Sequence, residues 1–332
     1  MSSLFRAFVA SIAAILIMSL PAVARNVPGS SGAAQGRVDL EVGSELTALS
    51  VASATTDALY YFCDSGVRRK TEMTDKALRN ESCNWGLNFR GELIHLTADP
   101  DGYDYDSTVG IVTALISHQM TDQTRLVMGP LFEKGSVDTN YNLGQTDFTG
   151  FGGTVGFVHD LNESLSLSLL GSAEWLKYDV SRTGGLYYGD YDALRLIVDA
   201  GAGGTLGDDN LWASYRTGLR YIHQDNNSYT EYTGGVPFAS VAGDNSESLL
   251  LVSNLRIGRT MEAITPFLEA SNNFSLLDSS STAINQTAWN GRVGTGFALE
   301  LASGLLELNS GVRFTTEGYA GYDVQLGYSL HF

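Results

Sequence analysis

Histidines and aspartates are the residues of this sequence best suited to acid–base chemistry. The five histidines are scattered and form no His-Glu-x-x-His motif or other paired spacing. His223 lies two residues before Asp225, and His159 directly precedes Asp160, so a hydrolytic site at a polar rim is conceivable. No Gly-x-Ser-x-Gly motif accompanies these pairs. We therefore expect no catalytic residues.

Four aspartates between positions 99 and 106 form an acidic cluster: Asp99, Asp101, Asp104 and Asp106. Carboxylate oxygens are the ligands that Ca²⁺ prefers. The cluster lacks the complete EF-hand spacing and the glutamate that ends it. The sequence therefore favours a solvated acidic loop, and we expect no metal and no cofactor.

A third group of ionisable residues lies in segments where polar and apolar side chains alternate. Between 192 and 206, Leu194, Leu196 and Val198 alternate with Arg195 and Asp199. A period of two is typical of a β-strand with two different faces. The charged residues assigned to the polar faces are Glu174, Arg195, Asp199, Arg216, Arg220, Arg256, Glu269, Arg292, Glu300, Glu307 and Arg313.

Twelve segments are predicted to be the strands that position these charges. They are 86–97, 107–119, 124–136, 147–159, 164–178, 192–206, 210–223, 247–259, 262–274, 288–302, 304–314 and 319–332. The connections alternate between short and mostly longer ones, and 224–246 is the longest. An even strand number with short turns on one side is typical of a transmembrane antiparallel β-barrel. The predicted fold is therefore all-β, with a barrel over 86–332.

The cost of placing a charge in lipid indicates which face of each strand points inward. An arginine or lysine facing lipid at the midplane costs about 2–4 kcal/mol, so the charged faces must line the lumen. One interpretation is an ion-pair network that fills and rigidifies a narrow lumen. The other is a selective pore. The small interior of a twelve-stranded barrel favours the network.

The N-terminus carries an export signal. Arg6 is followed by uncharged residues from 7 to 20, then by Pro21 and an Ala-x-Ala site that ends at Ala24. This pattern predicts a signal peptide over 1–24, because the uncharged run is shorter than the roughly 20 residues of a spanning helix. Export and a barrel together predict the outer membrane of a Gram-negative-type cell.

Residues 25–85 form a pre-barrel segment. Residues 26–37 are typical of a linker, and helices are possible over 39–62 and 71–80. Cys63 and Cys83 are predicted to form a disulfide in an oxidising compartment, which would stabilise the segment by roughly 3 kcal/mol. The enclosed residues are slightly basic. They are consistent with a plug docked on lumen carboxylates or with an exposed periplasmic cap.

The last strand ends on an aromatic residue after strict alternation. One face consists of Tyr322, Val324, Leu326, Tyr328, Leu330 and Phe332. The pattern looks like the signal that the barrel-assembly machinery recognises in outer-membrane proteins. We therefore expect this machinery and outer-membrane lipid as partners.

Four motifs together resemble one known family. They are GYDYDSTVG at 102–110, TPFLE at 265–269, GRVGTG at 291–296 and the closing 324–332 segment. In order and spacing they are similar to the translocator domain of autotransporters over about 86–332. The resemblance implies a twelve-stranded outer-membrane barrel, with a helix through the pore and an exported passenger. No passenger pattern is recognisable in 25–85, so the barrel itself is expected to be the functional product.

Composition narrows the functional classes. The chain has 332 residues, 20 Lys+Arg against 37 Asp+Glu and a formal net charge of −17, which disfavours nucleic acid as a partner. We expect a barrel without enzyme activity that acts as a pore, a translocator or a surface scaffold. The alternatives are an adhesin-like interaction protein that uses the 224–246 loop and, less favoured, an outer-membrane lipid hydrolase.

Overall fold

The described part of the chain is built from β-strands. The computed structural model describes residues 85–98, 105–139, 143–162, 164–208, 210–278, 289–301, 304–315 and 318–331. No helix within these ranges is long and apolar enough to span a membrane. The predicted signal peptide, pre-barrel helices, disulfide and Phe332 lie outside the described residues and stay predictions.

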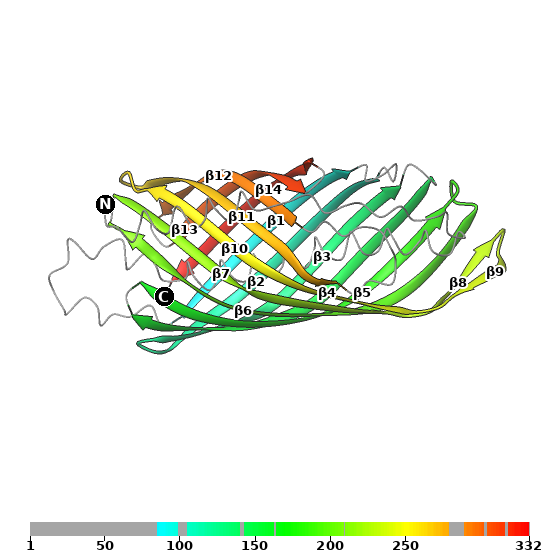
Figure 1. Ribbon diagram of the computed structural model, residues 1–332, viewed down its shortest axis with the longest axis horizontal. Coiled ribbons are helices and arrows are strands. Elements are labelled where there is room, and N and C mark those ends of the chain that lie inside the picture. The colour runs from blue at the N-terminus through cyan, green and yellow to red at the C-terminus, as the bar shows by residue number, and fades with distance from the viewer. Residues whose placement is uncertain are drawn as a thin grey trace.

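Twelve strands close into one antiparallel barrel (Figure 1). These are β1 (Trp85–Ala98), β2 (Tyr105–Thr121), β3 (Thr124–Thr139), β4 (Gly144–Asn162), β5 (Leu165–Arg182), β6 (Tyr187–Gly207), β7 (Leu211–Asn226), β10 (Asp244–Arg259), β11 (Ile264–Asp278), β12 (Trp289–Leu301), β13 (Gly304–Thr315) and β14 (Gly318–His331). Each pairs with its neighbours in this order, and β14 pairs with β1 to close the ring. The predicted twelve-stranded barrel is confirmed.

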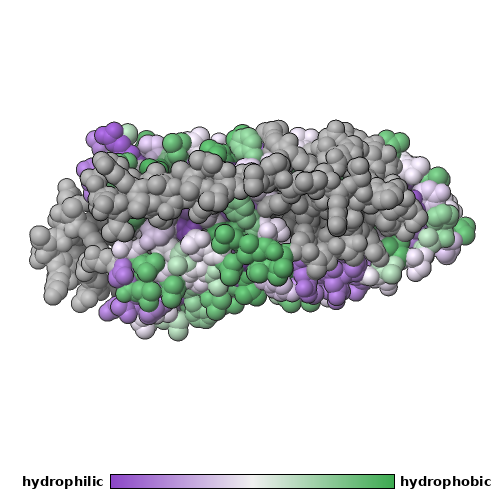
Figure 2. Space-filling view, in the orientation of Figure 1, coloured by the Kyte–Doolittle hydropathy of each residue, from purple (hydrophilic) through white to green (hydrophobic). Residues whose placement is uncertain are grey.

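The alternation seen in the sequence becomes two faces of the barrel wall. Along β5, buried Ser168, Leu170 and Glu174 alternate with exposed Leu169 and Trp175. Buried side chains line the interior because a closed single sheet has no other sheltered face. The exposed face is largely apolar, and Figure 2 shows apolar patches on the outside of the barrel with hydrophilic residues on both sides. This is the arrangement that a lipid-facing band requires.

The inner face is not polar throughout. One buried cluster of apolar side chains includes Ile94, Val109, Leu131, Leu176 and Ile222 and extends over most strands of the barrel. The apolar character of both faces of 107–119 in the sequence is explained by this cluster. Apolar side chains therefore share the inner wall with buried charged residues and with buried hydroxyl groups such as those of Ser168 and Ser172.

The longest predicted loop, 224–246, is largely a β-hairpin. Strands β8 (Tyr229–Thr233) and β9 (Val236–Val241) form it, and Tyr232 of β8 pairs with Tyr188 of β6. Gly234 and Gly235 form the turn with φ angles of 55° and 80°, a conformation that favours glycine. The hairpin projects beyond the barrel, away from the C-terminal end (Figure 1).

Candidate functional site

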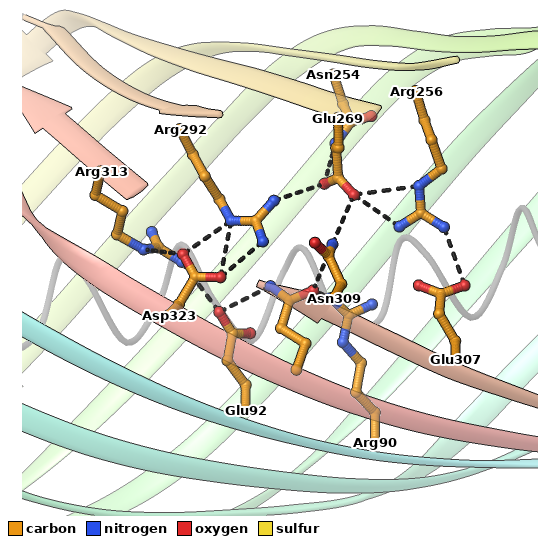
Figure 3. Close-up of polar contacts among 11 residues, drawn as sticks. Arg90, Glu92, Asn254, Arg256, Glu269, Arg292, Glu307, Asn309, Arg313 and Asp323 are labelled. Atoms are coloured by element: carbon orange, nitrogen blue, oxygen red, sulfur yellow. Dashed lines mark hydrogen bonds and ion pairs between the residues drawn. The ribbon is translucent and has the colours of Figure 1, made fainter. Parts of the chain in front are cut away.

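A network of arginines and carboxylates lines the wall formed by β10 to β14 and β1 (Figure 3). Asp323 accepts hydrogen bonds from Nε and Nη2 of Arg292 at 2.7–2.9 Å and from Nε of Arg313 at 2.9 Å. Nη2 of Arg313 donates to Glu92 at 3.0 Å. The Arg292–Asp323 bonds reach over β13, the strand between β12 and β14, and therefore cross the concave inner side of the sheet.

Glu269 is the second centre of this network. It accepts two hydrogen bonds from Arg256, at 2.8 and 3.1 Å, and one from Asn309 at 3.0 Å. Nη1 of Arg292 lies 3.3 Å from its other oxygen, and Nη1 of Arg256 also reaches Glu307 at 3.0 Å. Glu269 therefore links the β10 side of the wall to β12 and β13.

Arg90 completes the network by donating to Gln325 at 2.5 Å, and Gln325 donates to Glu92 at 3.0 Å. We define the wall network as Arg90, Glu92, Arg256, Glu269, Arg292, Glu307, Arg313 and Asp323 with their amide partners. Its four guanidinium groups balance its four carboxylates. Each guanidinium presents several fixed donors, which lets one arginine bridge strands that are not neighbours.

A second cluster lies on the wall formed by β3, β5 and β6. Nη1 of Arg195 donates to Glu133 at 2.9 Å and to Glu174 at 3.0 Å, and its Nε donates to Gln224 at 3.1 Å. The side chains of Arg195 and both glutamates are at most 1% exposed. The contact between β6 and β3 spans the two strands between them, so it again crosses the interior.

A third cluster forms where β6 meets β7. Asp199 accepts hydrogen bonds from Arg216 and from Nε of Arg220, the latter at 2.9 Å. Here two cations share one carboxylate, whereas Arg195 alone serves two carboxylates. The two clusters therefore carry opposite formal charge on the same side of the barrel.

Ten of the eleven charged residues expected in the lumen lie on the inner face. Nine of them are buried, and Glu307 is partly exposed. Glu300 is the exception, because it lies exposed near the end of β12 although its place in the strand has the inward parity. A residue so close to the connection to β13 is beyond the packed part of the lumen. The buried clusters therefore do not include Glu300.

Four charged members of these clusters were missing from the expected set: Arg90, Glu92, Glu133 and Asp323. A sequence signal existed for three of them: Arg90 and Glu92 alternate with Phe89, Gly91 and Leu93 in the first strand, and Asp323 alternates with Tyr322 and Val324 in the last one. Asp323 lies on the polar face of the last strand, but its ion pairs with arginines of other strands are not visible in the sequence.

The structure gives the histidines ordinary polar partners. His223 Nδ1 lies 3.4 Å from Glu247, and His159 Nδ1 lies 3.0 Å from the hydroxyl of Thr124. Asp160 pairs with Arg125 at 3.0 Å. Within the described residues, no group of three or more His, Cys, Asp or Glu side chains is arranged to hold a metal ion.

The comparisons with known proteins fit this architecture. The family model described as autotransporter beta-domain matches residues 87–329. The chain belongs to the autotransporter β-domain family. The resemblance seen in the sequence is thereby confirmed, and the protein is an integral outer-membrane β-barrel of autotransporter type. No curated protein sequence matches the chain.

Solved structures of other autotransporters share the fold of this β-domain. The translocator domain of the autotransporter NalP from Neisseria meningitidis is 15% identical with a TM-score of 0.67, and the match covers 85% of this chain and 98% of that chain. The beta domain of the Bordetella autotransporter BrkA is 16% identical with a TM-score of 0.55, covering 75% of this chain and all of that chain.

Proposed function

We propose that this β-domain works as a translocator-type pore of the outer membrane and has no catalytic role. The observation that supports this most strongly is the closed barrel whose inner wall holds a charge-balanced wall network. Arg292 and Arg313 tie three strands to Asp323, so the wall can keep its shape around a passing chain or ion. In this proposal the charged side chains stabilise the wall by cross-linking its strands through hydrogen bonds and ion pairs.

The pre-barrel segment is proposed to occupy or cap this pore. The residues between Cys63 and Cys83 carry a slight excess of basic side chains, which suits the one cluster in which Glu133 and Glu174 share the single cation of Arg195. The signal peptide over 1–24 and the disulfide between Cys63 and Cys83 belong to the same proposal. Both would deliver a stapled segment to the periplasmic mouth of the barrel.

Single-channel conductance in planar bilayers tests the pore. The mature chain and a variant without residues 26–84 are refolded, and heat-modifiable migration confirms that both are folded. We expect a larger conductance for the truncated form, because the barrel then loses its plug or cap. Absence of conductance in both folded forms would overturn the proposal.

A second candidate function is surface interaction through the β8–β9 hairpin. Its apolar residues Val236 and Phe238 are exposed, and Arg182 anchors its base by two bonds to Glu231, at 2.6 and 2.9 Å. Replacement of 229–241 by a short turn should abolish binding to host or bacterial cells if the hairpin is an adhesive surface. Unchanged binding of the folded variant would remove this candidate.

The exposed face of β14 is proposed to be the surface that the barrel-assembly machinery recognises. Tyr322, Val324 and Leu326 are exposed on this face, and the strand pairs with both β1 and β13. Removal of Phe332 should slow insertion into the outer membrane in cells, measured as the fraction of heat-modifiable barrel. Refolding in detergent should be little changed, because the proposed defect lies in recognition.

A further inference from the structure

Lysines and most arginines occupy opposite faces of the described barrel strands, and Arg259 at the periplasmic end of β10 is an arginine on the outer face. The buried arginines point inward, whereas the two lysines of the described residues, Lys134 on β3 and Lys177 on β5, are exposed on the outer face. Neither lysine forms an ion pair with another described residue. A cation on the lipid-facing side is costly at the membrane midplane and nearly free at the interface. We therefore ask at which depth of the membrane the two lysines lie, and which lipid group could pair with them there.

The strand register places both lysines in one row. Lys134 is paired with Thr149 of β4, and Thr149 is paired with Lys177. With neighbouring strands about 4.8 Å apart, the two lysine backbones lie about 10 Å apart. Their flexible side chains can therefore converge on one small anion above the hydroxyl of Thr149. We call these three residues the lysine row.

The lysine row lies near the border of the apolar band. Lys134 is ten residues beyond Thr124, where β3 begins at a short turn. At about 3.4 Å per residue and a tilt near 40°, this corresponds to a height of about 26 Å, close to the roughly 25 Å of the lipid-facing band. Short turns mark the periplasmic side, so the lysine row lies at the level of the outer-leaflet headgroups.

Below the lysine row lies a row of aromatic side chains. Phe132, Phe151 and Trp175 are paired across the same three strands, and each is between 46% and 66% exposed. They are two residues closer to the periplasm, or about 7 Å along each strand. This row offers a flat apolar surface for acyl chains, directly beneath the position where the lysines hold an anion.

Beyond the lysine row lies a row of carboxylates. Asp147 and Asp179 are paired, exposed and two residues farther out on β4 and β5. A second phosphate would be repelled there, whereas sugar hydroxyls can donate hydrogen bonds to carboxylates. The three rows in succession therefore suit acyl chains, then one phosphate, then a sugar.

From this order of rows we infer that the outer face of β3, β4 and β5 binds a phosphorylated glycolipid of the outer leaflet. Its acyl chains lie on the aromatic row, its phosphate lies between Lys134 and Lys177, and its sugar faces Asp147 and Asp179. The site is on the outside of the wall and is separate from the lumen clusters. It holds a lipid on the barrel whether or not the lumen conducts.

Native mass spectrometry of the full mature chain in detergent tests this site. The probes are a phosphorylated lipid A-type glycolipid, its dephosphorylated form, phosphatidylglycerol and inorganic phosphate. The variant Lys134→Gln with Lys177→Gln removes both cations. The control Arg259→Gln removes an exposed cation at the periplasmic end of β10. Heat-modifiable migration verifies folding of each variant.

We expect the phosphorylated glycolipid to bind the wild type and the control equally and the double lysine variant about 30-fold more weakly. Dephosphorylated glycolipid should bind the wild type as weakly as the phosphorylated form binds the double variant. Equal, lysine-dependent binding of phosphatidylglycerol would overturn the assignment to a glycolipid. Displacement by millimolar inorganic phosphate would overturn the assignment to a glycolipid, and equal binding to the double variant would overturn the site. An unfolded double variant would be replaced by the single changes Lys134→Gln and Lys177→Gln, each expected to weaken binding of the phosphorylated glycolipid about 5-fold. Binding equal to the wild type in both would overturn the site.

Discussion

At the scale of single residues, arginine and lysine have different roles in this barrel. Several buried arginines bridge two acceptors, as Arg195 does for Glu133 and Glu174 and Arg256 does for Glu269 and Glu307. A planar guanidinium has five donors in fixed directions and is less strongly hydrated than an ammonium group, which suits a packed interior. Lysine is a strongly hydrated point charge and suits the wet interface where Lys134 and Lys177 lie.

Replacing Arg195 tests how much the buried cluster stabilises the barrel. Arg195→Met keeps most of the side-chain volume but leaves Glu133 and Glu174 buried without their shared cation. Loss of one partner of a buried ion pair costs about 3–5 kcal/mol, so we expect the free energy of unfolding to fall by about that amount. Urea unfolding in lipid vesicles, followed by tryptophan fluorescence, measures it.

Arg259→Gln is the matched control, because it removes an exposed arginine of the outer face and should change stability by less than about 0.5 kcal/mol. A similarly small effect of Arg195→Met would contradict the prediction and would indicate that water solvates the cluster.

Asp208 gives a pH-dependent prediction in the turn between β6 and β7. Its carboxylate accepts hydrogen bonds from the backbone N–H groups of Leu211 and Asn210, both at 2.9 Å, and these bonds lower its pKa from the usual value. Because the pKa of Asp208 is lower in the folded state, the hydrogen bonds of its carboxylate stabilise the folded turn fully above the unfolded-state pKa. This stabilisation is lost as the pH falls through the folded-state value.

Hydrogen exchange of the Leu211 amide measures this contribution. Asp208→Asn keeps a side-chain acceptor that does not titrate, so the ratio of protection between wild type and variant should fall as the pH drops below about 4. A ratio that stays constant from pH 6 to pH 2 would contradict the role of the carboxylate.

At the scale of elements, alternation in the sequence was enough to predict the barrel strands. The observed strands extend beyond the predicted ones mainly at the ends opposite the short turns, as in β5, which continues through 179–182. Beyond the lipid band the outer face no longer has to be apolar, so the alternation weakens while the backbone pairing continues. Hydrogen bonding, which the sequence does not display, sets those ends.

The hairpin and the ion pairs show two different limits of sequence reasoning. Tyr229–Thr233 and Val236–Val241 flank Gly234 and Gly235, a recognisable hairpin signal that Pro237 in the second strand obscures. The pairing of Arg292 with Asp323 had no such signal, because it depends on the stagger between strands that are not neighbours. The candidate residues could therefore be predicted, but most of their partners could not.

Gly321 tests the close approach of β14 to β1. Its φ is +146°, and a Cβ at this position would collide with the carbonyl oxygen of His95. Gly321→Ala should therefore reduce the fraction of refolded, heat-modifiable barrel several-fold. Gly171→Ala on β5 is the control, because its Cβ would meet open space. Equal refolding of the two variants would contradict the predicted collision.

At the scale of the whole molecule, acidity and charge balance are separated in space. The chain carries a formal net charge of −17, yet the wall network is neutral, with four arginines and four carboxylates. Excess negative charge therefore lies outside this network, and within the described residues it includes exposed Asp147, Asp179 and Asp190 near the outer rim. The wall network therefore holds none of the excess negative charge of the chain.

The pairing of β1 with β14 closes the barrel wall, so cargo or ions could pass either through the lumen or through an opening of this seam. The two strands stay in register from Gly86 and His331 to Leu96 and Gly321. Within this seam, Asn88 donates a hydrogen bond to Ser329 at 2.7 Å, so both side chains are close enough for a designed disulfide. Asn88→Cys with Ser329→Cys should cross-link on oxidation and lock the seam shut.

If conduction uses the lumen, the oxidised double variant should conduct as the reduced form does, because locking the seam leaves the inner wall unchanged. Each single cysteine variant controls for oxidation itself, and migration on gels without reductant measures the cross-linked fraction. A loss of conductance on oxidation of the double variant, with its folded fraction unchanged, would show that the seam must open. Since continuous pairing between β1 and β14 holds the seam together, we expect the locked barrel to keep its full conductance.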